Sequence, residues 1–199
     1  KWPSYMPDSL PSIVDIGPGS PTGIAFGYGT AFPAKYQEAL YICDWSYGKM
    51  YAVHLAADGT TYTGKLGEFV SASPLPLTDV VVNPVDKALY FAIGGRRVKS
   101  GLYRVTYIGE ESTNPAAQRL FVRNAREQLE STFLSDTPDD RLELALKHLG
   151  SDDRHTRFAA RIALEHTPVD KWAGHLADLG VDAQLTGIMA VARSNATEL

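Results

Sequence analysis

The segments Ala39-Leu40-Tyr41-Ile42 and Ala88-Leu89-Tyr90-Phe91 are two versions of one short apolar strand. Each is followed, after a turn, by a second strand that begins with glycine. These second strands are Gly48-Lys49-Met50-Tyr51-Ala52-Val53 and Gly101-Leu102-Tyr103-Arg104-Val105. The two copies lie about 50 residues apart, which is a typical spacing of β-propeller blades. The internal repeat therefore predicts two consecutive propeller blades.

Strand and turn patterns extend the repeat in both directions. Ser46-Tyr47-Gly48 and Ala57-Asp58-Gly59 are turn sequences. They predict a first blade with strands at residues 22–28, 39–44, 49–55 and 62–70. The second blade has strands predicted at 78–82, 88–93 and 101–108, and no fourth strand is evident after Ile108.

A blade buries both faces only between neighbours, and a ring needs at least about four blades. We therefore expect these to be the last two blades of a larger ring, with the remaining blades of the same protein as partners. The missing strand would come from the N-terminal end of the full protein. The alternative is a small open antiparallel sheet.

The composition changes after Asn114-Pro115, where Gly, Pro and Tyr give way to Ala, Leu, Arg and acidic residues. This shift predicts blades over residues 1–113 and helices over 114–199. The first helix is expected from Asn114-Pro115 to Phe133, and the second from Pro138 to a stop at Gly150. A third follows the capping sequence Ser151-Asp152-Asp153. Further helices are expected at 169–179 and 183–192.

Short Ala-rich helices of this kind predict HEAT-like repeats that continue past Leu199. Such an array binds a protein partner along its concave surface or acts as a spacer. A generic helical bundle is the alternative.

Composition excludes several classes of function. The chain has 199 residues, a net charge of −4 and a pI near 5.7. It therefore lacks the basic footprint of a nucleic-acid-binding protein. No apolar run is long enough for a membrane span. Cys43 is the single cysteine, and the histidines have no metal-site spacing, so we expect no disulfide and no metal site within these residues.

Residues 40–107 resemble the C-terminal blades of glucose/sorbosone dehydrogenase-type propellers. They are most similar to large planctomycete proteins of the membrane-bound dehydrogenase type. The resemblance rests on five segments: Ser20-Pro21-Thr22-Gly23-Ile24, Phe32-Pro33-Ala34-Lys35-Tyr36, residues 40–48, residues 76–84 and Ser100-Gly101-Leu102-Tyr103-Arg104-Val105. It implies a six-bladed ring, HEAT-like helices, and a periplasmic or secreted location. It also implies a c-type haem in a domain outside these residues.

In a propeller, the loops that lead into each innermost strand lie on the same face as the loops joining the second and third strands. Here these loops cover residues 19–23, 44–48, 74–79 and 94–100, and ligand sites tend to form on such a face. The candidate ligand-face residues are Asp44, Trp45, Tyr47, Thr78, Asp79, Arg96, Arg97 and Lys99.

Each candidate has a structural alternative. Asp44 and Asp79 would orient a sugar hydroxyl, accept a proton or bind a metal, or they would simply bond loop amides. Trp45 and Tyr47 would stack on a sugar ring or pack at the rim between blades. The run Arg96-Arg97-Val98-Lys99 would hold an anion or form a solvated hairpin tip.

The resemblance can be tested at the cofactor positions of the soluble quinoprotein glucose dehydrogenases. Those enzymes use one lysine and two arginines to bind pyrroloquinoline quinone. The matching residues here are Ser46, Pro76 and Thr78. A quinone with three carboxylates needs cationic partners, so these residues argue against that cofactor. Arg96, Arg97 and Lys99 are the cations on the same face.

Two functions follow from this sequence. The resemblance predicts part of an oxidoreductase that acts on sugars or alcohols, although no catalytic group is identifiable here. The missing cations favour the alternative, a non-catalytic scaffold that binds protein or carbohydrate.

Overall fold

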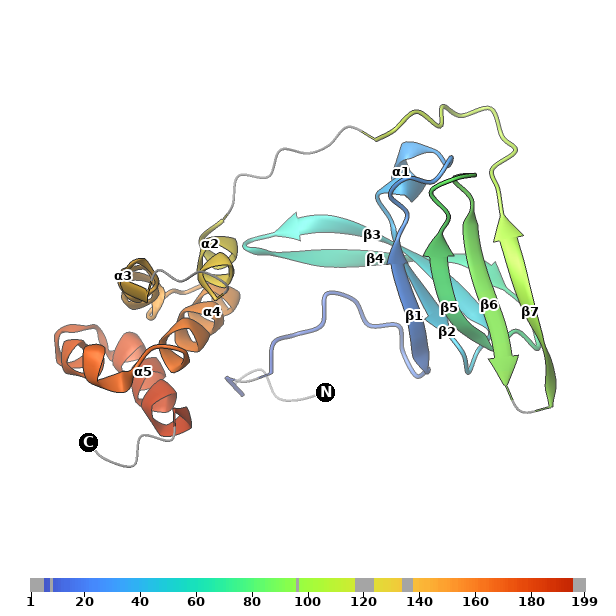
Figure 1. Ribbon diagram of the computed structural model, residues 1–199. Helices are drawn as coiled ribbons and strands as arrows, with labels where there is room; N and C mark the ends of the chain where they lie inside the picture. Colours follow the sequence, from blue (N-terminus) through green and yellow to red (C-terminus); the bar gives the residue numbers. More distant parts are fainter. Residues whose placement is uncertain (1–5, 8, 96, 117–123, 134–137, 195–199) are drawn as a thin grey trace. The chain divides into compact units, whose positions relative to one another are not determined.

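The computed structural model describes residues 6–7, 9–95, 97–116, 124–133 and 138–194 (Figure 1). The chain divides into two compact units, each described here by itself. One unit comprises residues 12–57 and 62–119, and the other comprises 120–199 with 1–11 and 58–61.

Two antiparallel sheets form the first unit. The first sheet has the order β1-β2-β3-β4, and the second has the order β5-β6-β7. A four-residue helix, α1 (Ala34–Gln37), connects β1 to β2. The strands are β1 (Pro21–Phe26), β2 (Leu40–Asp44), β3 (Lys49–Asp58), β4 (Thr61–Ser71), β5 (Leu77–Val82), β6 (Leu89–Gly95) and β7 (Val98–Val105). Every predicted strand is therefore present, with ends that differ by a few residues, and the described residues add no fourth strand to the second sheet.

The two sheets pack face to face around one apolar core. Tyr41 and Cys43 from β2 meet Leu89 and Phe91 from β6 in this core, and all four are buried. Alternate residues of β2, Leu40 and Ile42, point to the opposite face of the first sheet. There they pack with Val14 and Ile16 from the segment before β1.

The sheets stack in the same sense. Leu40 and Leu89 are equivalent residues of the sequence repeat. In the structure, Leu40 lies on the face of the first sheet that points away from the second, whereas Leu89 lies on the face of the second sheet that points toward the first. Equivalent residues thus face the same direction in both sheets. In a sandwich of two sheets related by a two-fold axis, equivalent faces would pack against each other. In this unit, the face of the first sheet packs against the non-equivalent face of the second sheet.

The register corrects one part of the predicted repeat. Aligning Gly48 with Gly101 pairs Tyr51 with Arg104. The strand pairs Leu40–Val53 and Leu89–Val105 instead make Val53 equivalent to Val105, and Tyr51 equivalent to Tyr103. A one-residue slip moves every side chain to the other face of a sheet, so the glycines do not set the alignment.

Both outer faces of the sheet pair carry exposed apolar side chains. Ile24 and Phe26 are 61% and 42% exposed on the first sheet, and Val81 and Leu102 are 59% and 72% exposed on the second. The described strands do not close a ring, and the structure shows two antiparallel sheets followed by helices.

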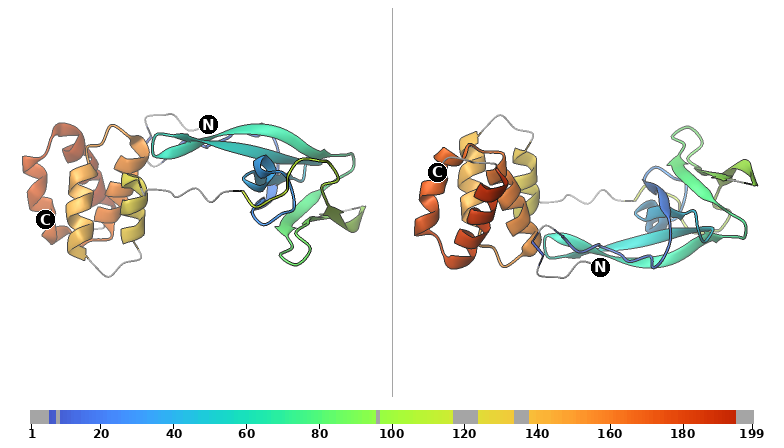
Figure 2. Two further views of the ribbon diagram at one scale, coloured as in Figure 1. Left: turned by 90° about the horizontal axis from the view of Figure 1, so that it is seen from above. Right: turned by 90° about the horizontal axis from the view of Figure 1, so that it is seen from below.

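The described residues of the second unit form four α-helices and two short 3-10 helices. Figure 2 shows the α-helices, coloured yellow to red, packed together. Asn124 caps α2 by accepting from the Glu127 N–H, and Asp153 caps α4 by accepting from the Thr156 N–H. The core joins Leu129, Leu149, Leu164 and Trp172, all fully buried. The elements are α2 (Ala125–Thr132), α3 (Pro138–His148), α4 (Arg154–Glu165), η1 (Val169–Lys171), η2 (Ala173–Asp178) and α5 (Val181–Arg193).

The predicted helix start at Asn114-Pro115 is wrong, because residues 114–116 are not helical. The buried Gln37 side chain holds this segment in another conformation. Its amide nitrogen donates to the carbonyls of Thr113 and Asn114, and its oxygen accepts from the Ala116 N–H at 2.9 Å. The described helix begins at Ala125 instead, where Asn124 supplies a cap.

The single helix predicted over 169–179 is replaced by η1 and η2. Trp172 separates them with a φ of −135°. Its ring is fully buried, and its Nε1 donates to the Thr167 carbonyl at 3.1 Å. Burial of this large side chain therefore interrupts the regular helix.

Candidate functional site

The first strands of the two sheets, β1 and β5, each carry an irregularity at the same point. The register shifts between Pro21 and Ile24 in β1 and between Leu77 and Asp79 in β5. Each shift places a threonine at the end of its sheet that carries the loops at residues 19–23, 44–48, 74–79 and 94–100. We call this end of the sheets the loop end. Thr22 Oγ1 donates to the Leu77 carbonyl, and Thr78 Oγ1 donates to the Ala92 carbonyl at 3.2 Å. Bulges re-aim side chains at sheet ends, so these threonines mark the end where the loops meet.

Asp44 ends β2 at this loop end and is fully buried. Its Oδ1 accepts from the N–H groups of Ser20 and Ser46 at 2.9 and 3.0 Å. Oδ2 has no hydrogen-bond partner among the described residues. A Cβ at Gly19 would lie 2.8 Å from Oδ2, so glycine is needed for the loop to approach this closely. Asp44 therefore bonds loop amides, as its structural alternative predicted, and retains one unused acceptor.

Trp45 and Tyr47 follow Asp44 in the turn. Trp45 is 41% exposed, and its Nε1 donates to the Gly94 carbonyl of the second sheet at 2.8 Å. Tyr47 is 57% exposed. Trp45 thus connects the two sheets while it leaves much of its ring accessible, and Tyr47 presents a second aromatic surface.

Asp79 lies on β5 directly against β1. Its Oδ1 accepts from the Val80 N–H at 2.8 Å. A Cβ at Gly23 would lie 2.5 Å from the Asp79 Cα, so β1 and β5 approach too closely for any side chain there. Burial, together with the Asp79 charge, raises the pKa of Cys43 to about 11, which makes Cys43 a packed thiol and not a nucleophile.

The basic run occupies the β6–β7 hairpin. Gly95 pairs with Val98, and Arg97 sits in the turn with a φ of 64°. Arg97 and Lys99 are both exposed. Arg96 lies outside the described residues. The described part of this run has the geometry of a hairpin tip.

The structure brings together some of the predicted residues and adds others. Asp44, Trp45 and Thr78 share the loop end with Ser20 and Ser46, whose hydroxyl oxygens are 2.7 Å apart. Ser20, Thr22 and Ser46 were not among the predicted site residues. The repeated Pro-Thr and Leu-Thr pairs at the starts of β1 and β5 could have identified Thr22, because Thr78 was already a candidate.

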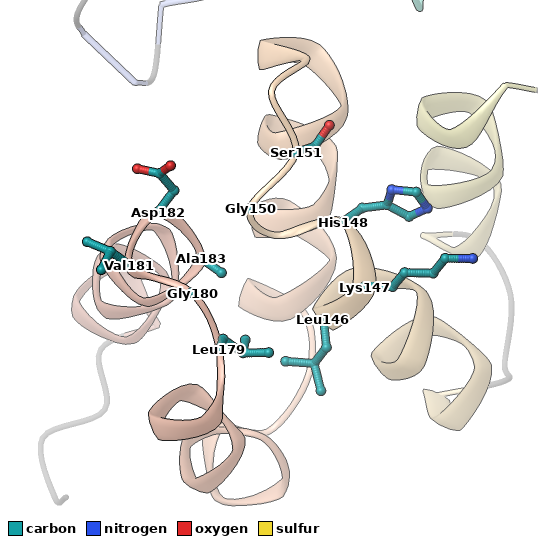
Figure 3. Close-up of a pocket in the computed structure, with 10 residues that line it drawn as sticks. All are labelled: Leu146, Lys147, His148, Gly150, Ser151, Leu179, Gly180, Val181, Asp182 and Ala183. Carbon is teal, nitrogen blue, oxygen red and sulfur yellow. The ribbon is translucent and has the colours of Figure 1, made fainter.

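The helical unit contains a pocket of about 400 Å³ at the turns before α4 and α5 (Figure 3). Leu146 and Leu179 point toward each other there, whereas Lys147, His148 and Asp182 point away. Burial, together with the Lys147 charge, lowers the pKa of His148. The polar groups therefore do not converge on a ligand position.

The described residues contain no group of three or more His, Cys, Asp or Glu side chains suited to a metal ion. None of the described helices is long and apolar enough to cross a membrane. Neither protein-family models, nor curated proteins, nor solved structures give a match to this chain.

Proposed function

We propose that the two sheets are neighbouring blades of a larger β-propeller whose loop end binds a carbohydrate. The observation that carries this proposal is the stacking of the sheets in the same sense. The outer face of the second sheet, with Tyr90 and Ala92, is equivalent to the face of the first sheet with Tyr41 and Cys43 that the second sheet covers.

Stacking of this kind is head-to-tail, and each added sheet leaves another uncovered face of the same type. Further sheets resolve this by closing a ring. The exposed Val81 and Leu102 at one end, and Ile24 and Phe26 at the other, are the faces that further blades would cover.

A complementation experiment tests the blade proposal. Ile24→Lys and Leu102→Lys each spoil one outer face at an exposed position. We expect the unmodified chain to associate head-to-tail as concentration rises in analytical ultracentrifugation. Each variant alone should stay monomeric, and an equimolar mixture should form dimers, because one good face of each type remains. Failure of the mixture to dimerise contradicts the proposal.

The carbohydrate part of the proposal rests on the side chains at the loop end. Trp45 and Tyr47 have exposed rings and flank Ser46 in the turn, and the hydroxyl oxygen of Ser46 lies 2.7 Å from that of Ser20. Aromatic faces suit the apolar faces of sugar rings, and hydroxyl groups suit sugar hydroxyls. A neutral polyhydroxy ligand also needs no cationic partner.

Nuclear magnetic resonance titration with neutral oligosaccharides tests this part. We expect chemical-shift changes at Ser20, Ser46 and Trp45. The changes at Ser20 and Ser46 should be abolished in Trp45→Ala. Tyr28→Ala is the matched control, because Tyr28 is 59% exposed and follows the opposite end of β1. Shifts that persist in Trp45→Ala, or no shift with any sugar, contradict the proposal.

Oxidation of sugars or alcohols stays a prediction for a longer protein. At this end, Ser46, Pro76 and Thr78 occupy the positions of the quinone-binding cations in the family that the sequence resembles. Dye-linked oxidation of a sugar panel by the longer protein, with and without pyrroloquinoline quinone, tests the prediction. Absence of turnover under both conditions would contradict it.

A further inference from the structure

The helices α4 and α5 are two copies of one packing pattern. The buried positions of α4 include Thr156, Ala159, Ala160 and Ala163. The buried positions of α5 have the same spacing and are Ala183, Thr186, Gly187 and Ala190. Small residues at these positions let neighbouring elements approach closely. In α5, a Cβ at Gly187 would lie 2.4 Å from a methyl carbon of Leu176 in η2. The two helices are therefore equivalent elements of successive repeats.

This equivalence matches each residue of α4 with one of α5. Arg161 corresponds to Ile188, and Glu165 corresponds to Ala192. Arg161 is 2% exposed, and its Nη1 lies 3.4 Å from Met189 Sδ of α5. Glu165 forms an ion pair with Arg193 of α5, with 3.2 Å between Oε1 and Nε. The side of α4 that carries Arg161 and Glu165 is thus the side that α5 covers.

The same side of α5 is apolar and exposed. Val181, Leu185 and Ile188 are 71%, 61% and 61% exposed, and Ala192 is exposed as well. Their spacing of four, three and four residues places them along one stripe of the helix. We call these four residues the α5 stripe.

We propose that the α5 stripe is covered by a further helix of the same polypeptide, which packs on α5 as α5 packs on α4. Continuity with the α4–α5 interface identifies the occupant. Among the described elements, α4 packs mainly against α2, α3 and α5, whereas α5 packs mainly against α4 and η2. In a stacked array, each repeat contacts its neighbours, and a terminal repeat needs a polar outer face. The α5 stripe is not such a face.

The size of the stripe favours a tethered helix over a second copy of the chain. A stable interface between separate proteins uses about 20 to 30 residues a side, and this stripe has far fewer. A helix on the same polypeptide has a high effective concentration and needs less surface. A head-to-tail copy would also present α2, where the exposed residues include the polar Gln128 and Ser131.

The test inserts a duplicate of residues 167–193 after Arg193 and leaves residues 194–199 at the end of the chain. Because α4 and α5 are equivalent, Arg193 corresponds to His166. The duplicate therefore follows α5 at the same register at which residues 167–193 follow α4 in the unmodified chain. We expect the α5 amides to exchange at least about tenfold more slowly than in the unmodified chain, and we expect the melting temperature of the helical unit to rise.

Two variants control this test. Ile188→Lys in the first α5 of the extended chain should abolish the added protection, because the new lysine would lie under the added helix without an acidic partner. Arg161 at the equivalent position of α4 pairs with Glu165, whereas residue 192 of α5 is alanine. The same substitution in the unmodified chain should leave α5 protection unchanged, since Ile188 is exposed there. An extended chain without added α5 protection would overturn the proposal. A stable dimer of the unmodified chain that Ile188→Lys dissolves would also overturn it, since the occupant would then be a second copy.

Discussion

Asp44 shows at the residue scale how one carboxylate organises the loop end. Its Oδ1 fixes the segment before β1 through Ser20 and the β2–β3 turn through Ser46. Hydrogen bonds from amides to a buried carboxylate are charge-assisted and stronger than neutral ones. The loops that present the aromatic rings thus depend on this side chain.

Replacement of Asp44 by Ala should lower the free energy of unfolding of the sheet unit by roughly 1–3 kcal/mol, because the bonded loop amides lose their acceptor. Urea denaturation followed through the amide signals of β2 and β6 in nuclear magnetic resonance spectra measures the change, because Trp172 of the helical unit also contributes to tryptophan fluorescence. Asp79→Ala is the matched control at the same end of the unit. It should stay within about 0.5 kcal/mol, because Asp79 is exposed and, among the described residues, its side chain bonds only its neighbour Val80. Equal losses in both variants would contradict the assigned role of Asp44.

Asp86 in the β5–β6 turn provides a test with pH. The Tyr90 hydroxyl donates to Oδ2 at 2.7 Å and, with Arg104 Nε at 2.8 Å, holds the pKa of Asp86 below its ordinary value. A depressed pKa in the folded state contributes stability above the pKa of the unfolded state, and this stability is lost as pH falls through the folded pKa.

We expect a carboxyl carbon titration by nuclear magnetic resonance to give a lowered midpoint for Asp86. Tyr90→Phe and Arg104→Gln should each move that midpoint upward. A midpoint that stays the same in both variants would show that neither group sets the pKa of Asp86.

At the element scale, β1 and β5 make the closest contact between the two sheets. Gly23→Ala should destabilise the sheet unit by roughly 1–3 kcal/mol, since the new Cβ would meet the Asp79 backbone and force the strands apart. Gly67→Ala in β4 is the control, because the nearest atom to its Cβ is the Ala52 carbonyl oxygen at 3.4 Å. Chemical denaturation should show little change for Gly67→Ala, and a tolerated Gly23→Ala would contradict the close approach.

The start of α4 depends on its cap. Asp153→Ala removes the acceptor for the Thr156 N–H, which lies 2.7 Å from Asp153 Oδ1, and should cost about 0.5–2 kcal/mol. Thermal unfolding followed by circular dichroism at 222 nm measures the loss. Asp152→Ala removes a neighbouring exposed carboxylate that is not the cap and should change stability by less than about 0.5 kcal/mol. A larger loss of stability in Asp152→Ala than in Asp153→Ala would mean that Asp153 is not the cap.

At the scale of the whole molecule, the two units have separate cores that share no residue. Leu149→Ala should destabilise the helical unit by about 2–5 kcal/mol, and Leu77→Ala should do the same to the sheets, because both side chains are fully buried. Hydrogen exchange should show faster exchange in α3 to α5 for the first variant and in β2 and β6 for the second. Loss of protection in both units from either variant would mean that they unfold as one.

The sequence by itself determined the local elements. Alternating apolar residues and turn sequences located the seven strands that the structure describes. The cap Asp153 located α4, and the stop Gly150 located the end of α3. These features depend on contacts between residues close in the chain, which a sequence displays directly. The sequence also identified Asp44 as a candidate, because an aspartate at the end of a strand commonly accepts hydrogen bonds from loop amides.

Tertiary structure alone decided the ends of the interrupted helices and the packing of the elements, because these features depend on contacts between residues distant in the chain. Gln37 holds residues 113–116 away from a helix, and burial of Trp172 divides the segment 169–179. The sense in which the sheets stack follows from which face of β2 meets which face of β6, and a one-residue slip in the sequence alignment obscures it. The apolar stripe of α5 resembles a core face in the sequence, and only the packing of α5 on α4 shows that it is exposed.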